Sequence, residues 1–572
     1  MKKFYLFCLV LIFTGCIEKG DQTVETRTQR STPKAQMKTP DDHSGLNRPN
    51  ILLIVADDLG YSDLGIYGSE IKTPNLDALA MSGIMLTDFH AAPLCSVTRA
   101  MLMSGTDNHL AGLGTMAETQ RFPLGEPGYE GYLNFRVATL AELMADAGYN
   151  TYMTGKWHLG LSEELSPAAR GFDKSFALTS GGAAHLDGMS VYGPASAGTE
   201  KARYRENGKL VGVPDKYYTT RFFTEKMIEY IDSQKNDSKP FFGYLAYTAP
   251  HWPLQAPDES RDKYKGVYDE GYDALAAQRL TRMKKLKLAP KDAMLYPRWP
   301  GQPAWEDLSA KQKTLEARKM ELYAAMVDDL DVYVGRVLTH LQDIGEYDNT
   351  IIVFISDNGP EYRTRVPPIL AEWYDKCCDF SFENMGKTRS WVMYGPNWAR
   401  ASAGHLRSFK GHPTEGGIRV PAIISYPELS VKGIINDSFA SVLDLMPTFL
   451  ELAGAEHPGT TYKGRQIHPI SGESMLAGLI GTSNVFHGPD YVMGWESVGS
   501  GAIRQGDWKM VRDVPPLGTF SWQLYNIAQD PQERYDVTGE NPAKVTELKT
   551  LWGNYTRDNG VIALPFPPKK TH

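Results

Sequence analysis

Two apolar, β-branched runs constrain the fold of this chain most strongly, because each has the length of a buried strand and each stops at acidic residues. Residues 50–58 read NILLIVADD, and residues 349–359 read NTIIVFISDNG. A continuous apolar run of this kind is typical of a parallel strand that is covered on both faces. The pattern predicts two buried parallel strands that both end in side chains with oxygen atoms.

Helical and strand-like segments alternate around these two runs. Helices are expected at residues 73–83 and 137–149, where glycine marks the end of each segment. Further strands are expected at residues 239–250 and 419–427, which are bounded by proline. Alternating strands and helices predict an α/β fold with a large mixed, mainly parallel sheet flanked by helices.

The sequence changes character near the C-terminus. From about residue 485 it carries short aromatic segments separated by turns, which predict a small C-terminal antiparallel β+α unit. We therefore expect a catalytic domain over residues 48–484 and a subdomain over residues 485–572. The charged residues 259–320 are expected to form an insertion over the rim of the large sheet.

The N-terminus has the features of an export signal. Residues 1–15 begin with two lysines after Met1 and continue with an apolar run that is too short to span a bilayer as a mature helix. The run ends at Cys16 and resembles a bacterial lipoprotein signal, in which that cysteine is lipidated. Simple secretion is the alternative. Residues 16–47 are expected to form a flexible tether, so the protein would face the periplasm or the cell surface and touch the membrane only through Cys16.

Composition excludes several classes of protein. The 572 residues are 42% hydrophobic, enough for a large core, and the net charge of -8 with dispersed acidic residues argues against a nucleic-acid partner. Five cysteines are too few for a disulfide scaffold in an exported protein. Cys95 is therefore either bonded to Cys377 or Cys378, a small buried hydrophobe, or a reactive group.

The two acidic strand ends predict a metal site. Asp57 and Asp58 end the first strand, and Asp357 and Asn358 end the second. In open α/β sheets the carboxyl ends of the strands form the binding crevice. Carboxylates crowded there would repel each other without a cation, and all-oxygen ligation suits Ca²⁺ or Mg²⁺ rather than zinc. The two pairs together favour one calcium ion, whereas either pair alone favours a turn or a helix N-cap.

A second group of candidate residues is cationic. Five side chains lie in loops rich in Gly and Pro that follow apolar segments: Arg99, Lys156, His158, His251 and Lys410. Around a metal ion, such groups would bind a compact dianion or a sulfate ester and stabilise the charge that develops on it. Taken singly, each could equally be a surface charge or a packed loop histidine.

Seven segments, in order, resemble the type I sulfatases, and most of all the bacterial arylsulfatases of the Pseudomonas kind. The segments are PNILLIVADDLGYSDLGIYG, CSVTRAMLMSG, GYNTYMTGKWHLG, APHWPLQAP, ISDNG, KGHPTEGGIRVP and LYNIAQDPQERYDV. The resemblance spans roughly residues 48–566. It implies an alkaline-phosphatase-like fold and a hydrolase of aryl or carbohydrate sulfate esters.

The resemblance also implies a modified cysteine. In this family the cysteine of C-x-P-x-R is oxidised to formylglycine by a formylglycine-generating enzyme before the protein folds, and the hydrated aldehyde supplies the nucleophile. Cys95 would be that residue, and Arg99 would hold the hydrate. Asp57, Asp58, Asp357 and Asn358 would bind calcium beside the residue formed from Cys95.

The remaining roles follow from the same resemblance. Lys156, Lys410 and His251 would neutralise the sulfate, and His251 or Lys410 would assist the leaving oxygen. Asp357 is a candidate base for the attack. His158 would take the proton whose removal expels sulfate and restores the aldehyde.

One position departs from the family pattern, since Val97 stands where the motif has proline. Proline fixes a backbone angle and lacks an amide donor, so its absence affects the peptide that the modifying enzyme grips. Two rival functions therefore stay open. One is a phosphonate or phosphate monoesterase of the same fold, and the other is a lipoprotein that binds sulfated glycans without turnover because Cys95 is unmodified.

Overall fold

The computed structural model describes residues 48–118, 125–191, 201–233, 237–364, 370–429 and 431–563. The predicted signal, the tether and Cys16 lie outside these ranges, so export and lipid anchoring stay predictions. Within the same ranges, every helix is too short or too polar to cross a membrane.

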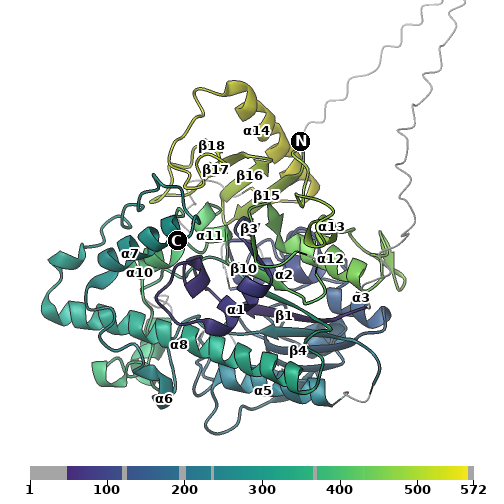
Figure 1. Cartoon of the computed structure of the whole chain (residues 1–572), viewed down its shortest axis with the longest axis horizontal. Helices are drawn as coiled ribbons and strands as arrows, with labels where there is room; N and C mark the ends of the chain where they lie inside the picture. Colours follow the sequence, from purple (N-terminus) through teal and green to yellow (C-terminus); the bar gives the residue numbers. More distant parts are fainter. Residues whose placement is uncertain are drawn as a thin grey trace, which may run out of the picture. The chain divides into compact units, whose positions relative to one another are not determined.

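A ten-stranded sheet forms the centre of the described part of the chain (Figure 1). Its order is β11 (Ile434–Asn436), β2 (Ile84–Leu86), β10 (Ala422–Ser425), β9 (Thr350–Ser356), β1 (Asn50–Ala56), β8 (Phe241–Ala246), β4 (Asn150–Lys156), β5 (Lys174–Leu178), β6 (Tyr204–Glu206) and β7 (Lys209–Val211). The run from β9 to β5 is parallel, whereas β10, β6 and β7 pair with their neighbours in antiparallel fashion. The predicted large, mixed, mainly parallel sheet is confirmed.

The two apolar runs are neighbouring strands. β1 and β9 pair in parallel from Asn50 opposite Thr350 to Ala56 opposite Ser356, and every residue of both strands is buried. The Asp357 amide then donates a hydrogen bond to the Ala56 carbonyl over 3.0 Å. This register brings the two acidic strand ends to the same point of the sheet edge.

Helices cover both faces of the sheet. Alternate β1 side chains enter two cores, because successive residues of a strand point to opposite faces. Leu52 and Ile54 pack in a core with α1 (Pro74–Ser82), α5 (Thr219–Asp232) and α8 (Ala310–Asp343). Leu53 and Val55 pack in a core with α2 (Cys95–Ser104), α3 (Leu140–Asp146) and α12 (Leu445–Leu452). Figure 1 shows α5 running alongside α8.

Both helices expected from the sequence are present, and their ends have local causes. α1 starts at Pro74, whose fixed φ suits the first helical position, and it stops before Gly83. α3 begins with a capping box, in which Thr139 accepts a hydrogen bond from the Glu142 amide and the Glu142 carboxylate accepts one from the Thr139 amide. The strands expected at residues 239–250 and 419–427 correspond to β8 and β10.

The predicted small antiparallel sheet is also confirmed. It contains β15 (Val492–Ser497), β16 (Ser500–Gln505), β17 (Trp508–Arg512) and β18 (Gln523–Asn526) in that order, and α14 (Pro542–Asp558) packs on one of its faces. Trp495, Ala502 and Val511 pack instead into the core that contains α2. The boundary at residue 484 stays a prediction. The expected insertion at residues 259–320 contains most of α6 (Asp258–Arg261), α7 (Gly271–Lys285) and the start of α8.

The structure excludes one of the alternatives for Cys95. Cys377 and Cys378 form a disulfide with each other, and Cys95 is free and buried. A disulfide between Cys95 and either of these residues is therefore ruled out in this structure.

Gly155 provides a test of the sheet packing. It precedes Lys156 in β4 with a φ of 109°, and an added Cβ would lie 1.8 Å from the Ala246 carbonyl oxygen of β8. We expect Gly155→Ala to lower the free energy of unfolding by about 3 kcal/mol, because it forces two central strands apart and strains the backbone. Urea denaturation measures the change.

Gly553→Ala is the matched control for this substitution. Gly553 lies in α14 with open space around its Cα, so alanine there should stabilise the protein by about 0.5–1 kcal/mol. Equal effects of the two substitutions would contradict the packing described for β4.

Candidate active site

The acidic residues that end β1 and β9 form a buried cluster with Cys95. One ligand atom from each of Asp57, Asp58, Cys95 and Asp357 lies within 4.8 Å of all the others. Asn358 joins the cluster, because its side-chain amide donates a 2.7 Å hydrogen bond to Asp58 Oδ1. The structure thus brings together all five residues predicted to surround the metal.

Two oxygen atoms of this cluster lack partners. Asp57 Oδ1 and Asn358 Oδ1 are buried and accept no hydrogen bond from the described residues. A buried acceptor without a partner costs free energy, so such atoms are expected to face a bound group. Oxygen ligands in a cluster of carboxylates are the donor set that Ca²⁺ prefers. The residues present therefore fit a calcium ion.

Each of the three carboxylates has its own cation. Lys156 Nζ lies 2.7 Å from Asp57 Oδ2, and Lys410 Nζ lies 2.6 Å from Asp58 Oδ1. Arg99 donates to Asp357 Oδ2 from Nε over 3.0 Å and from Nη2 over 2.7 Å. Burial alone would lower the pKa of both lysines, but the carboxylates outweigh it: the pKa of Lys156 is raised by Asp57, and that of Lys410 is raised well above its usual value by Asp58.

Arg99 is tied to the framework of the site. Besides Asp357, its guanidinium donates from Nη1 to the Lys156 carbonyl over 2.7 Å and to the Tyr244 hydroxyl over 3.3 Å. These bonds join α2, β4, β8 and the end of β9. The observed partners make Arg99 an anchor for Asp357, and its role in holding a hydrate stays a prediction.

Cys95 is the first residue of α2 and is almost completely buried. Its thiol lies 3.7 Å from Asp58 Oδ1. Burial raises the pKa of this thiol well above its usual value, although Lys156 and Lys410 act in the opposite direction. The unmodified thiol is therefore protonated and a poor nucleophile at neutral pH.

His251 faces the acidic cluster with one ring nitrogen. Its Nδ1 lies 2.6 Å from the Trp252 carbonyl, so Nδ1 carries a proton, because a carbonyl can only accept. Its Nε2 lies 3.6 Å from Asp58 Oδ2. Burial lowers the pKa of His251, although Asp58 and Asp57 act in the opposite direction.

His158 has a partner that the sequence did not reveal. Its Nε2 lies 3.1 Å from both carboxylate oxygens of Glu118, while its buried Nδ1 has no partner among the described residues. Burial lowers the pKa of His158, and Glu118 acts in the opposite direction. Burial raises the pKa of Glu118, but His158 outweighs it and brings that pKa down to about 2.

Glu361 and Tyr244 were also missed by sequence reasoning. Glu361 is buried, with Oε2 3.5 Å from Lys410 Nζ and 3.4 Å from the Trp252 indole nitrogen, which donates to it. The sequence could have indicated that Glu361 lies near the site, because it follows Asn358 by three residues in the same loop. The sequence contains no such signal for Glu118 or Tyr244, because each is far in sequence from the residue that it contacts.

A second acidic cluster differs from the first in the partners of its ligand atoms. Asp88, His90 and Glu415 also place ligand atoms within 4.8 Å of one another. Three fixed cations already serve its two carboxylates, because Arg504 and Arg419 pair with Asp88, and Lys509 pairs with Glu415. Both carboxylate oxygens of Glu415 have partners, Lys509 and His90, so Glu415 offers no free oxygen to an ion.

Comparison with known proteins agrees with this site. A sequence model of the family described as Sulfatase matches residues 49–455, and one described as N-sulphoglucosamine sulphohydrolase, C-terminal, matches residues 410–553. The chain belongs to the sulfatase family, and it is a hydrolase of sulfate esters. The resemblance inferred from the sequence is thereby confirmed.

Particular relatives cover most of the chain. An uncharacterized sulfatase of Schizosaccharomyces pombe is 43% identical over 91% of this chain and 95% of its own length. An arylsulfatase of Klebsiella aerogenes is 36% identical over 75% of this chain and 92% of its own length. The crystal structure of Ps i-CgsB is 28% identical with a TM-score of 0.65, and it covers 90% of this chain and 94% of its own.

The contact between Glu118 and His158 predicts a change in pH dependence. Glu118→Gln removes the carboxylate that raises the pKa of His158, so that pKa should fall further. If His158 accepts a proton during turnover, the acidic limb of the pH–rate profile moves to lower pH, and the maximal rate falls about tenfold because the ring loses its orienting partner.

Hydrolysis of an aryl sulfate across a pH series measures this prediction. Glu163→Gln is the control, because Glu163 pairs with Lys209 at the exposed surface and should leave the profile unchanged. A Glu118→Gln profile identical to that of the unsubstituted protein would show that this contact has no part in turnover.

Proposed function

We propose that this protein cleaves aryl or carbohydrate sulfate esters with a formylglycine derived from Cys95 and one bound calcium ion. The observation that carries the proposal is the arrangement around Cys95. Three carboxylates and three cations converge on the buried thiol, and two ligand oxygens there lack partners. The charge of an added divalent ion would then be available to an anionic substrate.

Asp57, Asp58, Asp357 and Asn358 would hold the calcium ion. When bound, the ion would stabilise negative charge on the sulfate oxygens without transferring a proton. Lys156 and Lys410 are buried next to these ligands and carry fixed positive charges. Both can therefore bind the remaining sulfate oxygens in surroundings where water is excluded, which strengthens each interaction.

Formylglycine would supply a hydrated aldehyde, one hydroxyl of which would attack sulfur as a base removes its proton. Arg99 fixes the position of Asp357 through two hydrogen bonds to Oδ2, and the Asp357 carboxylate is the candidate base for the attack. His251 or Lys410 would donate a proton to the leaving oxygen. His158, oriented by Glu118, would accept the proton that is removed when sulfate is released.

The relatives support both kinds of sulfate ester. The Klebsiella aerogenes relative is named an arylsulfatase, and a crystal structure of Ps i-CgsB contains k-i-k-neocarrahexaose. Beside the site of this chain, the Trp252 ring stacks on His251 with centroids 5.2 Å apart, and Trp391 packs next to Trp252. Aromatic rings of this kind pack against either an arene or the apolar face of a sugar.

The metal assignment predicts opposite results for two acidic clusters. Asp57→Asn should reduce calcium from about one ion per chain to near zero after dialysis, and activity should fall about a hundredfold. Asp88→Asn, in the second cluster, should leave the calcium content at about one ion per chain. Elemental analysis measures the ion, and circular dichroism checks folding. Calcium retained by Asp57→Asn, or lost equally from both variants, would contradict the assignment.

Val97 predicts an effect on maturation. It is the third residue of α2, and the first four amides of a helix have no acceptor within the helix. Proline there removes no helical hydrogen bond and presets the backbone that the modifying enzyme must grip. We expect Val97→Pro to raise the fraction of Cys95 converted to aldehyde, and activity should rise in proportion.

Peptide mass spectrometry across residues 93–105 counts aldehyde against thiol in both forms, and hydrolysis of an aryl sulfate is followed in parallel. Val97→Thr, which keeps the side-chain volume but lacks the ring, is the control and should not raise conversion. Full conversion of the unsubstituted protein would show that Val97 is harmless. Turnover by protein that is entirely thiol would overturn the formylglycine proposal.

A further inference from the structure

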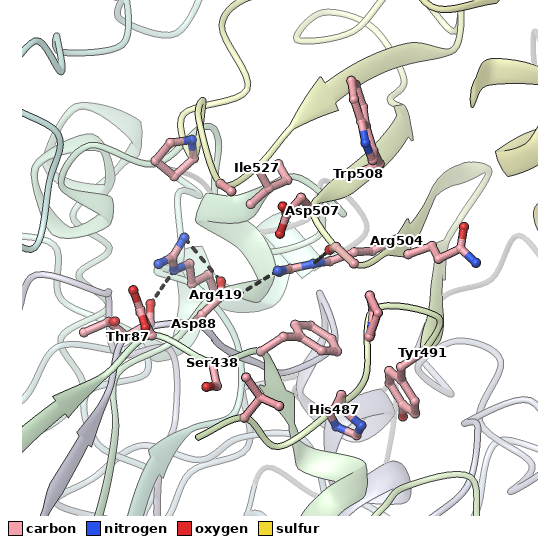
Figure 2. Close-up of a pocket in the computed structure, with 18 of the residues that line it drawn as sticks. Thr87, Asp88, Arg419, Ser438, His487, Tyr491, Arg504, Asp507, Trp508 and Ile527 are labelled. Atoms are coloured by element: carbon pink, nitrogen blue, oxygen red, sulfur yellow. Dashed lines mark hydrogen bonds and ion pairs between the residues drawn. The ribbon is translucent and has the colours of Figure 1, made fainter. Parts of the chain in front are cut away.

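A second pocket lies away from Cys95 and contains none of the residues assigned to the active site. It has a volume of about 1030 Å³ and is bordered by the end of α7, the segment after β11 and the small antiparallel sheet. Figure 2 shows Arg504 extending across this pocket towards Asp88 and Arg419. Thr87 and Asp88 follow β2, which lies three strand positions from β1, or about 14 Å along the sheet.

Arg504 has a donor without a partner. Its side chain is buried, with 7% exposure, and donates from Nη2 to Asp88 Oδ2 over 2.8 Å and from Nε to the Gly506 carbonyl over 2.9 Å. The guanidinium also lies over the Phe439 ring, 4.3 Å from its centroid. Nη1 is buried with no hydrogen-bond partner in the described residues. A fixed guanidinium with a free donor is a ready site for a sulfate or carboxylate oxygen.

The rim of the pocket carries both signs of charge. Lys284, Lys287 and Lys291 line one part of it, and their side chains form no ion pair with any described residue. Asp437, Asp490 and Asp507 line other parts. A densely anionic chain would meet repulsion from these carboxylates. The mixture instead suits a ligand with many hydroxyl groups, which donate to carboxylates and accept from ammonium groups.

Aromatic side chains complete the pocket. Tyr491 stacks on His487 with centroids 3.7 Å apart, and Figure 2 places both on one side of Arg504 and Trp508 on the other. Trp508 is half-buried and is the first residue of β17. Rings of this kind contact the apolar faces of sugars while their polar edges remain hydrated.

We propose that this pocket binds a sugar unit that bears one sulfate or carboxylate group, with the acidic group on Arg504 and a sugar ring against Trp508 or Tyr491. The volume of about 1030 Å³ is at the upper end of the range of small-molecule sites, so a ligand of more than one ring can be accommodated. The inference deepens the proposed function, on which it rests, because it makes an oligosaccharide the substrate class. The pocket would hold a part of the substrate that is not cleaved.

Calorimetry on the full-length Cys95→Ala chain tests the proposal without turnover. The probes are 6-O-sulfated N-acetyllactosamine, unsulfated N-acetyllactosamine and inorganic sulfate. Arg504→Lys keeps a cation for Asp88 but removes the free Nη1 donor. Arg465→Lys is the matched control, since Arg465 pairs with Glu142 and does not line the pocket.

We expect Arg504→Lys to weaken binding of the sulfated disaccharide about tenfold and Arg465→Lys to leave it unchanged. The unsulfated disaccharide should bind the Cys95→Ala protein about tenfold more weakly than the sulfated one. The rim substitutions Lys287→Asn and Lys291→Gln, combined, should weaken binding about threefold and give a second test if Arg504→Lys fails to fold.

Equal binding of the sulfated disaccharide by all these variants would overturn the proposal. A loss of inorganic sulfate binding in Arg504→Lys as large as the loss for the disaccharide would overturn it too, because the pocket would then be a simple anion site. Hydrolysis of a small aryl sulfate by Arg504→Lys with Cys95 intact should match the unsubstituted protein. If neither the unsubstituted protein nor Arg504→Lys hydrolyses the aryl sulfate, the proposed function fails. The calorimetry then still shows whether the pocket binds the sulfated disaccharide.

Discussion

Three carboxylates packed around one buried point require a cation beside each of them, and this requirement ties the site to the whole fold. Asp57, Asp58 and Asp357 lie in the interior, where an ionised carboxylate is tolerated only beside a cation or strong donors. The cations come from separate parts of the fold: Lys156 from the end of β4, Arg99 from α2 and Lys410 from the loop after α10 (Pro396–Ala403). The site therefore exists only when strands, helix and loop are all in place.

The small C-terminal sheet holds the loop that carries Lys410. Arg407 donates to the Tyr525 hydroxyl, and His412 Nδ1 lies 2.9 Å from a carboxylate oxygen of Asp513. Lys509 of β17 bridges Glu415 and Glu533 in the interior. These contacts lie on both sides of Lys410 in the sequence and fix its position against Asp58. This gives the sheet a role in the chemistry although it supplies no residue to the acidic cluster.

The sequence predicted those features of the fold and the site that depend on a local residue pattern. Two apolar runs ending in acidic residues gave the central parallel strands, and their register places Asp57 beside Asp357. Contacts between distant parts of the chain carry no spacing signal, so the sequence did not indicate Glu118 beside His158 or Tyr244 beside Arg99. The sequence analysis did not anticipate the disulfide between Cys377 and Cys378, because sequence alone does not show whether neighbouring thiols bond to each other.

The central claim is that this buried cluster cleaves sulfate esters rather than the phosphate esters that the same fold and charges could also bind. The direct test is kcat/KM for 4-nitrophenyl sulfate and 4-nitrophenyl phosphate, using calcium-loaded full-length protein produced with a formylglycine-generating enzyme. We expect a preference for the sulfate ester of about a hundredfold or more, and loss of sulfate hydrolysis in Cys95→Ala. An equal or higher value for the phosphate ester, or unchanged sulfate hydrolysis by Cys95→Ala, would contradict it.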